Sequence, residues 1–448
     1  MSSMVSPTVR LKADRPDDAL LARPSRIEDT GLSFDLLLEL VLKHLYTKGV
    51  QTQGDLAAGL ALSGAIVAML IAQLKRQASI EVLTAVAQNG LRYALTDKGR
   101  VGALEAMDRS GYTGPAPITL EHYEALCLAQ SVHRHQGTLS AMHAAFADTV
   151  IPRDLLDQLG SAVHSARPIF VYGLPGTGKT FITQRISRLL GEAVYVPHAV
   201  AVGEEIFQLF DPAFHHALEQ PVDAAPDDDI LHLQRGHDPR LVHCRRPFVM
   251  SGGELTMAGL EIGVDERARL ETAPLQLKAS NGIYLIDDLG RQRMPVTELF
   301  NRWIVPMESK QDYLTLASGK RFQVPFDVIL IFSTNLEPRD LADDAFLRRI
   351  GHKIHFKPMP EAEYRRIWQD MLAARELQAE PGALDYLIEE LHAKHGVPLL
   401  PSHPRDLSGM IRDRVRYTGE APVVTPAHMR DAWENFFVSF DRDTLPQE

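Results

Sequence analysis

The strongest constraint in the sequence is a glycine-rich loop between an apolar strand and a helix. The strand pattern is Ile169–Tyr172, and helical periodicity continues from Phe181. The loop between them reads Gly173-Leu174-Pro175-Gly176-Thr177-Gly178-Lys179-Thr180. Glycines let the backbone wrap closely, so that successive N–H groups and the helix N-terminus face a phosphate. This order predicts an α/β P-loop fold with a parallel sheet rather than a glycine-rich turn with a surface lysine.

The last two residues of the loop carry most of its expected chemistry. Lys179 is predicted to reach the β- and γ-phosphates of ATP, and the Thr180 hydroxyl to ligate Mg²⁺. The six residues from Gly173 to Gly178 are expected to bind the phosphates through their backbone. The sequence therefore predicts ATP and Mg²⁺ as cofactors.

Two further apolar strands end in polar residues. Ile283–Ile286 is followed by Asp287 and Asp288, and Val328–Phe332 leads through a Ser-Thr pair to Asn335. Parallel sheets place ligands at the carboxyl ends of their strands, so both groups are expected beside the loop. Asp287 is predicted to hold Mg²⁺, Asp288 to polarise the attacking water, and Asn335 to orient it. Taken alone, the acidic pair also fits a helix cap, and Asn335 a turn.

Composition indicates the class of protein and its surroundings. The chain has 448 residues, 45% hydrophobic and 23% charged, which fits two or three globular domains. Its formal net charge of −11 gives no default attraction to nucleic acid or anionic membrane. The two cysteines, Cys127 and Cys244, fit no metal or redox spacing. With no signal-peptide pattern and no long apolar run, we expect a cytoplasmic protein without membrane insertion.

Changes in residue pattern divide the chain into five parts. Residues 1–30 are predicted to be a flexible leader, 111–165 a linker and helical connector, and 166–357 the nucleotide-binding domain. Residues 358–448 have helical periodicity interrupted by prolines. Residues 31–110 form a separate N-terminal domain.

The N-terminal domain has the element order of a winged helix-turn-helix. An apolar helix from Phe34 to Tyr46 precedes two short helices at about 53–61 and 63–77, and Asn89-Gly90 marks a hairpin turn. A helix that reads DNA needs long polar side chains in its first half. Here the second short helix begins with small and aliphatic residues. We therefore favour a protein contact, and DNA docking through the wing stays open.

The order of the loop and the two polar strand ends resembles the AAA+ ATPases. Two more segments fit that family: Asp344-Ala345-Phe346-Leu347-Arg348-Arg349-Ile350 and His403-Pro404-Arg405-Asp406-Leu407. The resemblance covers about residues 165–440. It implies a C-terminal α-helical lid, an arginine finger at Arg348 or Arg349 that acts on a neighbouring subunit, and a sensor-2 role for Arg405. A finger acting in trans implies a homo-oligomeric ring, with a hexamer expected.

One residue departs from the family pattern. The family usually has Asp-Glu where this chain has Asp287-Asp288. The Asp288 side chain is one methylene shorter, and an error of about 1 Å in position can cost 10²-fold in rate. Slow hydrolysis, or an ATP-gated switch with weak turnover, therefore stays open.

The remaining patterns lie between the core strands. Residues 313–316 and 320–324 flank Ser318-Gly319 as a hairpin, which resembles the pre-sensor hairpin branch of AAA+ proteins, including MoxR-like chaperones and enhancer-binding activators. Ala193–Val196 is expected to be the second core strand. Roughly eighty residues, long for a crossover, separate it from the next core strand.

That long insertion contains three notable segments. Asp223–Asp229 is an acidic loop, and Gly252-Gly253-Glu254 fits a contact loop or a bulged hairpin turn. Six histidines fit no compact ligand set, so a metal site is not favoured; they are His198, His215, His216, His232, His237 and His243.

Taken together, these features predict a ring-forming AAA+ ATPase. ATP binding and hydrolysis would drive the remodelling or assembly of a protein partner recruited by the winged-helix domain. One alternative is a DNA-tethered regulatory ATPase switch, and another is a weakly hydrolysing ATP-binding scaffold. Nothing in the sequence identifies the protein client.

Overall fold

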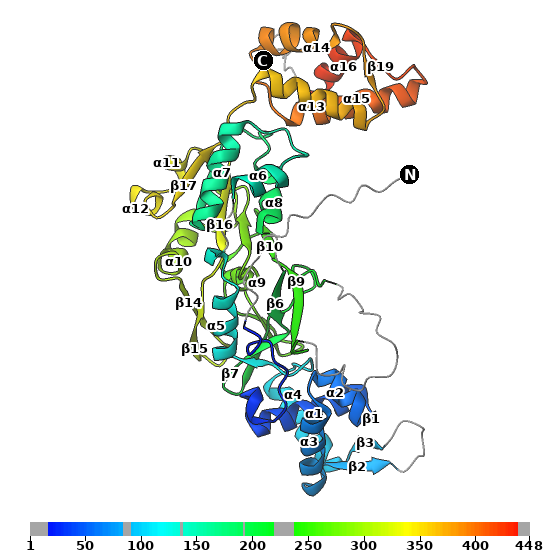
Figure 1. The fold of residues 1–448 in the computed structure, drawn as a ribbon, viewed down its shortest axis with the longest axis vertical. Helices are drawn as coiled ribbons and strands as arrows, with labels where there is room; N and C mark the ends of the chain where they lie inside the picture. The colour runs from blue at the N-terminus through cyan, green and yellow to red at the C-terminus, as the bar shows by residue number, and fades with distance from the viewer. Residues whose placement is uncertain (1–16, 84–90, 135–137, 191–192, 219–236, 438–448) are drawn as a thin grey trace, which may run out of the picture.

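The computed structural model describes residues 17–83, 91–134, 138–190, 193–218 and 237–437. Its elements form an elongated molecule, with the N-terminal unit at one end, a central sheet in the middle and a C-terminal helical unit at the other end (Figure 1). The Asn89-Gly90 turn, the Asp223–Asp229 loop, His232 and the first half of the predicted leader lie outside the described residues.

The N-terminal unit is a helical bundle with a small sheet on one side. It contains α1 (Phe34–Lys48), β1 (Gln51–Thr52), α2 (Gln53–Leu60), α3 (Gly64–Arg76), β2 (Ile80–Leu83), β3 (Arg92–Leu95) and α4 (Asp97–Arg109). The antiparallel sheet has the order β1-β3-β2. Side chains of Ser33, Thr52, Ser63 and Thr96 accept backbone N–H groups at the helix starts. The helices expected at 34–46, 53–61 and 63–77 are therefore confirmed.

Two segments expected to be flexible are packed. In the described part of the leader, Leu21 is buried and its carbonyl accepts the Asp238 amide at 2.8 Å. In the expected linker, a side chain at Gly111 would approach the Ala268 carbonyl oxygen to 1.6 Å, and Tyr112 is buried. Glycine there allows close backbone contact rather than motion.

The connector leads from that packed segment to the central sheet. It consists of β4 (Ile118–Thr119), α5 (Leu120–Ala129), η2 (Val132–Arg134), α6 (Leu139–Ala145) and α7 (Arg153–Ser165), while η1 (Glu28–Thr30) precedes the N-terminal unit. Mostly helical structure was expected here and is confirmed.

The central sheet is fully parallel. Its strands, in spatial order, are β10 (Phe248–Ser251), β13 (Ile283–Ile286), β16 (Ile329–Thr334), β5 (Ile169–Tyr172) and β17 (His352–His355). Successive residues of β13 enter two different cores. One core includes α7 and α8 (Lys179–Ile186), and the other includes α10 (Val296–Ser309). Helices therefore cover both faces, as the predicted α/β core requires.

The prediction for the second core strand is wrong. Ala193–Val196 lies in β6 (Ala193–Pro197), which pairs antiparallel with β9 (Leu241–Arg245) outside the central sheet. β10 occupies the expected position beside β13. Gly252–Glu254 consequently follows a parallel core strand at the carboxyl edge of the sheet and is not a hairpin turn, whereas the contact-loop alternative stays a prediction.

A second layer of β-structure fills the space between the sheet and the N-terminal unit. Its mixed sheet has the order β11-β12-β8-β7-β4, with β7 (Ala199–Val202), β8 (Glu205–Gln208), β11 (Gly263–Asp265) and β12 (Leu270–Thr272). The predicted hairpin is confirmed as β14 (Gln311–Thr315) and β15 (Arg321–Pro325). The short elements η5 (Met257–Leu260) and α9 (Leu275–Lys278) link these layers.

The C-terminal unit has its own apolar core around Tyr364, Trp368, Leu407 and Trp433. It contains α13 (Glu361–Ala374), β18 (Gln378–Ala379), α14 (Ala383–Asp385), η6 (Tyr386–Ala393), α15 (Ser402–Thr418), β19 (Val423–Val424) and α16 (Pro426–Phe436). Three further short helices lie near the sheet: η3 (Ser187–Leu190), α11 (Pro338–Leu341) and α12 (Asp344–Leu347).

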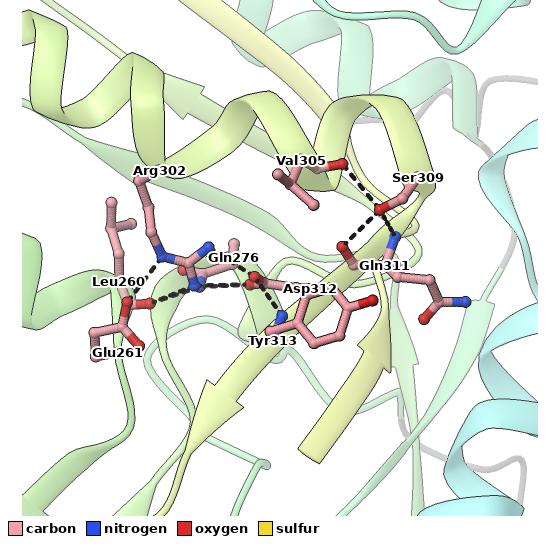
Figure 2. A network of polar contacts seen from close by, with 9 residues as sticks. All are labelled: Leu260, Glu261, Gln276, Arg302, Val305, Ser309, Gln311, Asp312 and Tyr313. Carbon is pink, nitrogen blue, oxygen red and sulfur yellow. Dashed lines mark hydrogen bonds and ion pairs between the residues drawn. The ribbon is translucent and has the colours of Figure 1, made fainter. Parts of the chain in front are cut away.

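A buried polar network joins α10 to the hairpin (Figure 2). Arg302 on α10 donates to both Asp312 carboxylate oxygens, at 2.7 and 3.2 Å, and to Glu261 at 2.8 Å. Gln276 donates to Asp312 at 3.1 Å. A charge so deeply buried requires such partners.

Within the described residues, no single helix is long and apolar enough to cross a membrane. The pair α2 and α3 reaches the required length and composition together, but it bends by 115° between them.

Candidate nucleotide site

The glycine loop lies where the sequence predicted it, between β5 and α8. Gly173, Gly176 and Gly178 have φ values of 143°, 85° and 86°, which side chains rarely allow. A side chain at Gly173 would also approach the Phe356 carbonyl oxygen to 2.3 Å, and one at Gly176 would approach the Ser402 hydroxyl to 2.4 Å. Gly173 and Gly176 are therefore limited to glycine by both conformation and space, and Gly178 by conformation.

Lys179 is buried at the start of α8 and has neutral partners. Its Nζ atom donates to the carbonyl oxygens of Gly173 and Leu174, both at 2.9 Å, and to Asn335 Oδ1 at 2.7 Å. Burial lowers the pKa of Lys179, and the charges of Asp287 and Asp288 partly oppose this shift. The ammonium therefore lies in a cradle of dipoles, beside carboxylates that it does not touch.

Thr180 and Asp287, the two residues that the sequence predicted as Mg²⁺ ligands, are in contact with each other. The Thr180 hydroxyl donates to Asp287 Oδ2 at 2.6 Å, although the residues lie 107 positions apart. A hydroxyl and a carboxylate are hard oxygen donors of the kind that Mg²⁺ accepts, together with water and phosphate oxygens. These residues therefore fit a Mg²⁺ ion that accompanies a bound nucleotide. Among the described residues, no group of three or more His, Cys, Asp or Glu side chains could hold a metal by itself.

Asp288 and Asn335 are also in contact. The Asn335 amide donates to Asp288 Oδ1 at 3.2 Å while its carbonyl oxygen accepts from Lys179. Asp288 has a φ of 49°, in the left-handed region. Besides glycine, Asp and Asn tolerate this region best, so the backbone here favours Asp over the Glu of the family pattern.

The two candidate finger arginines are placed differently. Arg349 pairs with Glu308 at 2.5 Å and donates to the Ala345 carbonyl at 2.7 Å. Arg348 lines a cavity of about 490 Å³ whose other lining residues include Tyr172 and Lys353. Within the described part of the chain, neither guanidinium hydrogen-bonds to the glycine loop, Asp287 or Asp288.

Arg405 lies on the first turn of α15, and within the described residues its side chain contacts none of the other predicted site residues. Its side chain is 67% exposed, and Nε donates to Asp406 at 2.7 Å. The same helix nevertheless reaches the loop through its backbone, because the Ser402 amide donates to the Gly176 carbonyl at 3.2 Å. Sequence patterns did not indicate this contact, since Ser402 belongs to no motif.

Gln292 is a second residue that sequence reasoning missed. Its side-chain amide donates to the backbone carbonyls of Asp287 and Asp288, at 3.1 and 3.2 Å, and its oxygen accepts the Gly290 amide at 2.8 Å. A polar residue soon after an acidic strand end is too common to be singled out by pattern.

Comparisons with known proteins give limited matches. A family profile described as "Domain of unknown function (DUF8689)" matches residues 360–435, within the C-terminal unit. A comparison with curated proteins found no match.

Among solved structures, the chain is similar to the Thermotoga maritima RuvB Holliday junction branch migration motor, at 12% identity and a TM-score of 0.37. That match covers 67% of this chain and 72% of the other. It is also similar to NtrX from Brucella abortus, at 15% identity and a TM-score of 0.39, covering 69% of this chain and 61% of the other.

Proposed function

We propose that this chain is an AAA+ ATPase that couples ATP binding and hydrolysis to the remodelling or assembly of a protein partner. The observation that carries the proposal is the convergence of five residues from three strand ends. Lys179, Thr180, Asp287, Asp288 and Asn335 are connected by hydrogen bonds at the carboxyl edge of one parallel sheet. Parallel sheets bind nucleotides at this edge.

The geometry suggests how these residues divide the work. Lys179 would exchange its neutral acceptors for the β- and γ-phosphate oxygens, and Thr180 and Asp287 would hold Mg²⁺. When bound there, Mg²⁺ would supply positive charge at the transferring phosphate. Asp288 accepts a hydrogen bond from the attacking water, and Asn335, released by Lys179, orients that water.

We assign the trans-acting finger to Arg348 rather than Arg349. Arg349 is held within its own subunit by Glu308 and the Ala345 carbonyl. Arg348 faces a cavity, and a guanidinium fork can bind two phosphate oxygens. Because the finger would complete a neighbour's site, the proposal includes a homo-oligomeric ring, with a hexamer expected.

The C-terminal unit is proposed to act as a lid. α15 already contacts the loop through Ser402 and Gly176. Arg405, on the same first turn, would exchange Asp406 for the γ-phosphate when the lid closes. The lid is therefore positioned to respond to the occupancy of the loop.

The N-terminal unit is proposed to be a winged-helix adaptor that contacts protein. The exposed residues of α3 are mostly small or apolar: Gly64, Ala65, Ala68, Met69 and Ala72. Reading base edges needs long polar side chains at these positions. A cytoplasmic location is part of the proposal and rests on the sequence alone.

The test mixes two inactive variants. Lys179→Ala lacks the phosphate cradle and Arg348→Ala lacks the finger, so each alone should lose about 10³-fold in ATP turnover. In rings that contain both variants, the intact glycine loop of an Arg348→Ala subunit can lie beside the intact Arg348 of a Lys179→Ala subunit. ATP turnover should therefore return in part. Arg349→Ala, the matched control, should keep most of its activity.

Two results would contradict the proposal. A wild-type chain that cleaves ATP no faster than Lys179→Ala would leave the scaffold alternative in its place. Full ATP turnover in Arg348→Ala would show that Arg348 is not the trans-acting finger. The proposal of a site shared between subunits would then lose its support.

A further inference from the structure

The turn that carries Asp288 is strained and must be held in place. Asp288 and Gly290 both have positive φ, at 49° and 104°. A side-chain-bearing residue in the left-handed region costs about 1–2 kcal/mol. Such conformations persist where surrounding contacts fix them.

One side of the turn is fixed to the neighbouring strand. The Leu289 amide donates to the Ser333 carbonyl at 2.8 Å, and the Thr334 hydroxyl donates to the Leu289 carbonyl at 2.7 Å. Leu289 is buried, whereas Asp288 and Gly290 on either side are exposed. These contacts hold one polar atom of each peptide beside Leu289 and leave the other two atoms, the Asp288 carbonyl and the Gly290 amide, to other partners.

Gln292 supplies those partners. It donates to the carbonyls of Asp287 and Asp288 and accepts from the Gly290 amide, so it binds the peptides on both sides of Leu289. Both ends of its side-chain amide are used. The Arg291 amide adds one backbone bond to the Asp288 carbonyl at 3.0 Å.

We propose that Gln292 is a positioning residue, which holds Asp288 in its left-handed conformation and so sets the Asp288 carboxylate against Asn335. This inference rests on the proposed ATPase function and deepens it. Asp288 has one methylene less than the family's Glu, so its reach depends on the backbone from which it projects. Gln292 fixes that backbone without touching the glycine loop, Lys179 or Thr180 in the contacts described above.

A positioning role predicts a specific kinetic pattern. Gln292→Met keeps the length of the side chain and removes its three hydrogen bonds. We expect kcat to fall between about 10-fold and 100-fold, the cost of a misplacement of about 1 Å. The dissociation constant for MgATP should stay within about 3-fold, because Lys179, Thr180 and Asp287 keep their own contacts. Gln323→Met, on the exposed side of β15, is the matched control and should match wild type.

A double-variant cycle separates positioning from general support of the fold. In an Asp288→Asn background the carboxylate is already gone, so adding Gln292→Met should change kcat by less than about 2-fold. Single-turnover cleavage of labelled ATP with excess protein measures these slow rates. The midpoint of thermal unfolding, taken for every variant, verifies that each is folded.

The outcomes are distinguishable. A wild-type chain without ATP cleavage overturns the proposed function and this inference with it. Active wild type with a fully active Gln292→Met overturns the inference alone. The inference is also overturned if Gln292→Met lowers the affinity for MgATP as much as it lowers kcat. It is likewise overturned if adding Gln292→Met lowers kcat as much in the Asp288→Asn background as in wild type. In either case Gln292 would support the whole site.

Discussion

Arg302, whose side chain is 13% exposed, and the buried Lys179 are both cations on helices beside the central sheet, yet their partners differ in kind. Arg302 contacts two carboxylates, those of Asp312 and Glu261 (Figure 2). Lys179 contacts two backbone carbonyls and one amide oxygen. The positive charge of Arg302 is neutralised by carboxylates, whereas that of Lys179 is only solvated by neutral dipoles.

This difference separates a structural charge from a functional one. Removing one member of a buried ion pair leaves its partner as an uncompensated charge. A cation held by neutral oxygens can exchange them for an anion without leaving a carboxylate behind. Together with the glycine loop around it, this makes Lys179 suited to receive phosphate.

Breaking the Arg302 network should have the largest effect on stability. Arg302→Met leaves Asp312, which is almost fully buried, without its arginine. We expect a loss of about 3 kcal/mol in the free energy of unfolding, measured by urea denaturation.

The control for that loss is an arginine with the same number of carboxylate partners, at a more exposed site. Arg365 also contacts two carboxylates, Glu361 and Asp385, but both are more than half exposed. Arg365→Met should cost less than about 1 kcal/mol. Equal losses at the two arginines would contradict the role assigned to burial.

Lys43→Met should change stability less than Arg302→Met does, and it tests whether burial alone marks a functional site. It is buried in α1, and desolvation lowers its pKa from 10.5 to about 8, with Glu39 opposing the shift. Between pH 8 and 10.5 the unfolded chain binds more protons than the folded one, so stability should rise with pH across that window.

Lys43→Met should remove this pH dependence and raise stability at pH 7 by about 1 kcal/mol. Urea midpoints measured at pH 7 and pH 10 for both proteins give the comparison. A wild type whose stability falls from pH 8 to pH 10 while the Lys43→Met variant stays level would show that the sign is wrong. Unlike Lys179, Lys43 has no glycine loop around it.

Local sequence patterns predicted most of the fold because its core strands are short apolar runs with clear ends. Ile169–Tyr172 and Ile283–Ile286 match β5 and β13 residue for residue. Pairing between distant segments was harder. Ala193–Val196 is as apolar as Phe248–Ser251, and only the tertiary structure decides that the latter lies beside β13. The glycines within residues 111–117 likewise led to the prediction of a linker, because close packing and flexibility both favour glycine.

The site was predicted as far as its motifs extend. Lys179, Thr180, Asp287, Asp288 and Asn335 come together as expected. The left-handed backbone of Asp288 had no sequence signal, since Asp is common in every loop. Gln292 and Ser402 act through backbone groups of other residues, which no side-chain pattern records. The roles of Arg348 and Arg405 depend on a neighbouring subunit and a moving lid, and stay predictions.

The most direct test of the central claim compares ATP binding with stability in Lys179→Met. Without nucleotide, the variant should unfold within about 0.5 kcal/mol of wild type, because no carboxylate loses its partner. With MgATP at 100 times the dissociation constant of wild type, wild type should gain about 2.7 kcal/mol and the variant almost nothing. A Lys179→Met variant that MgATP stabilises as much as wild type would contradict the account.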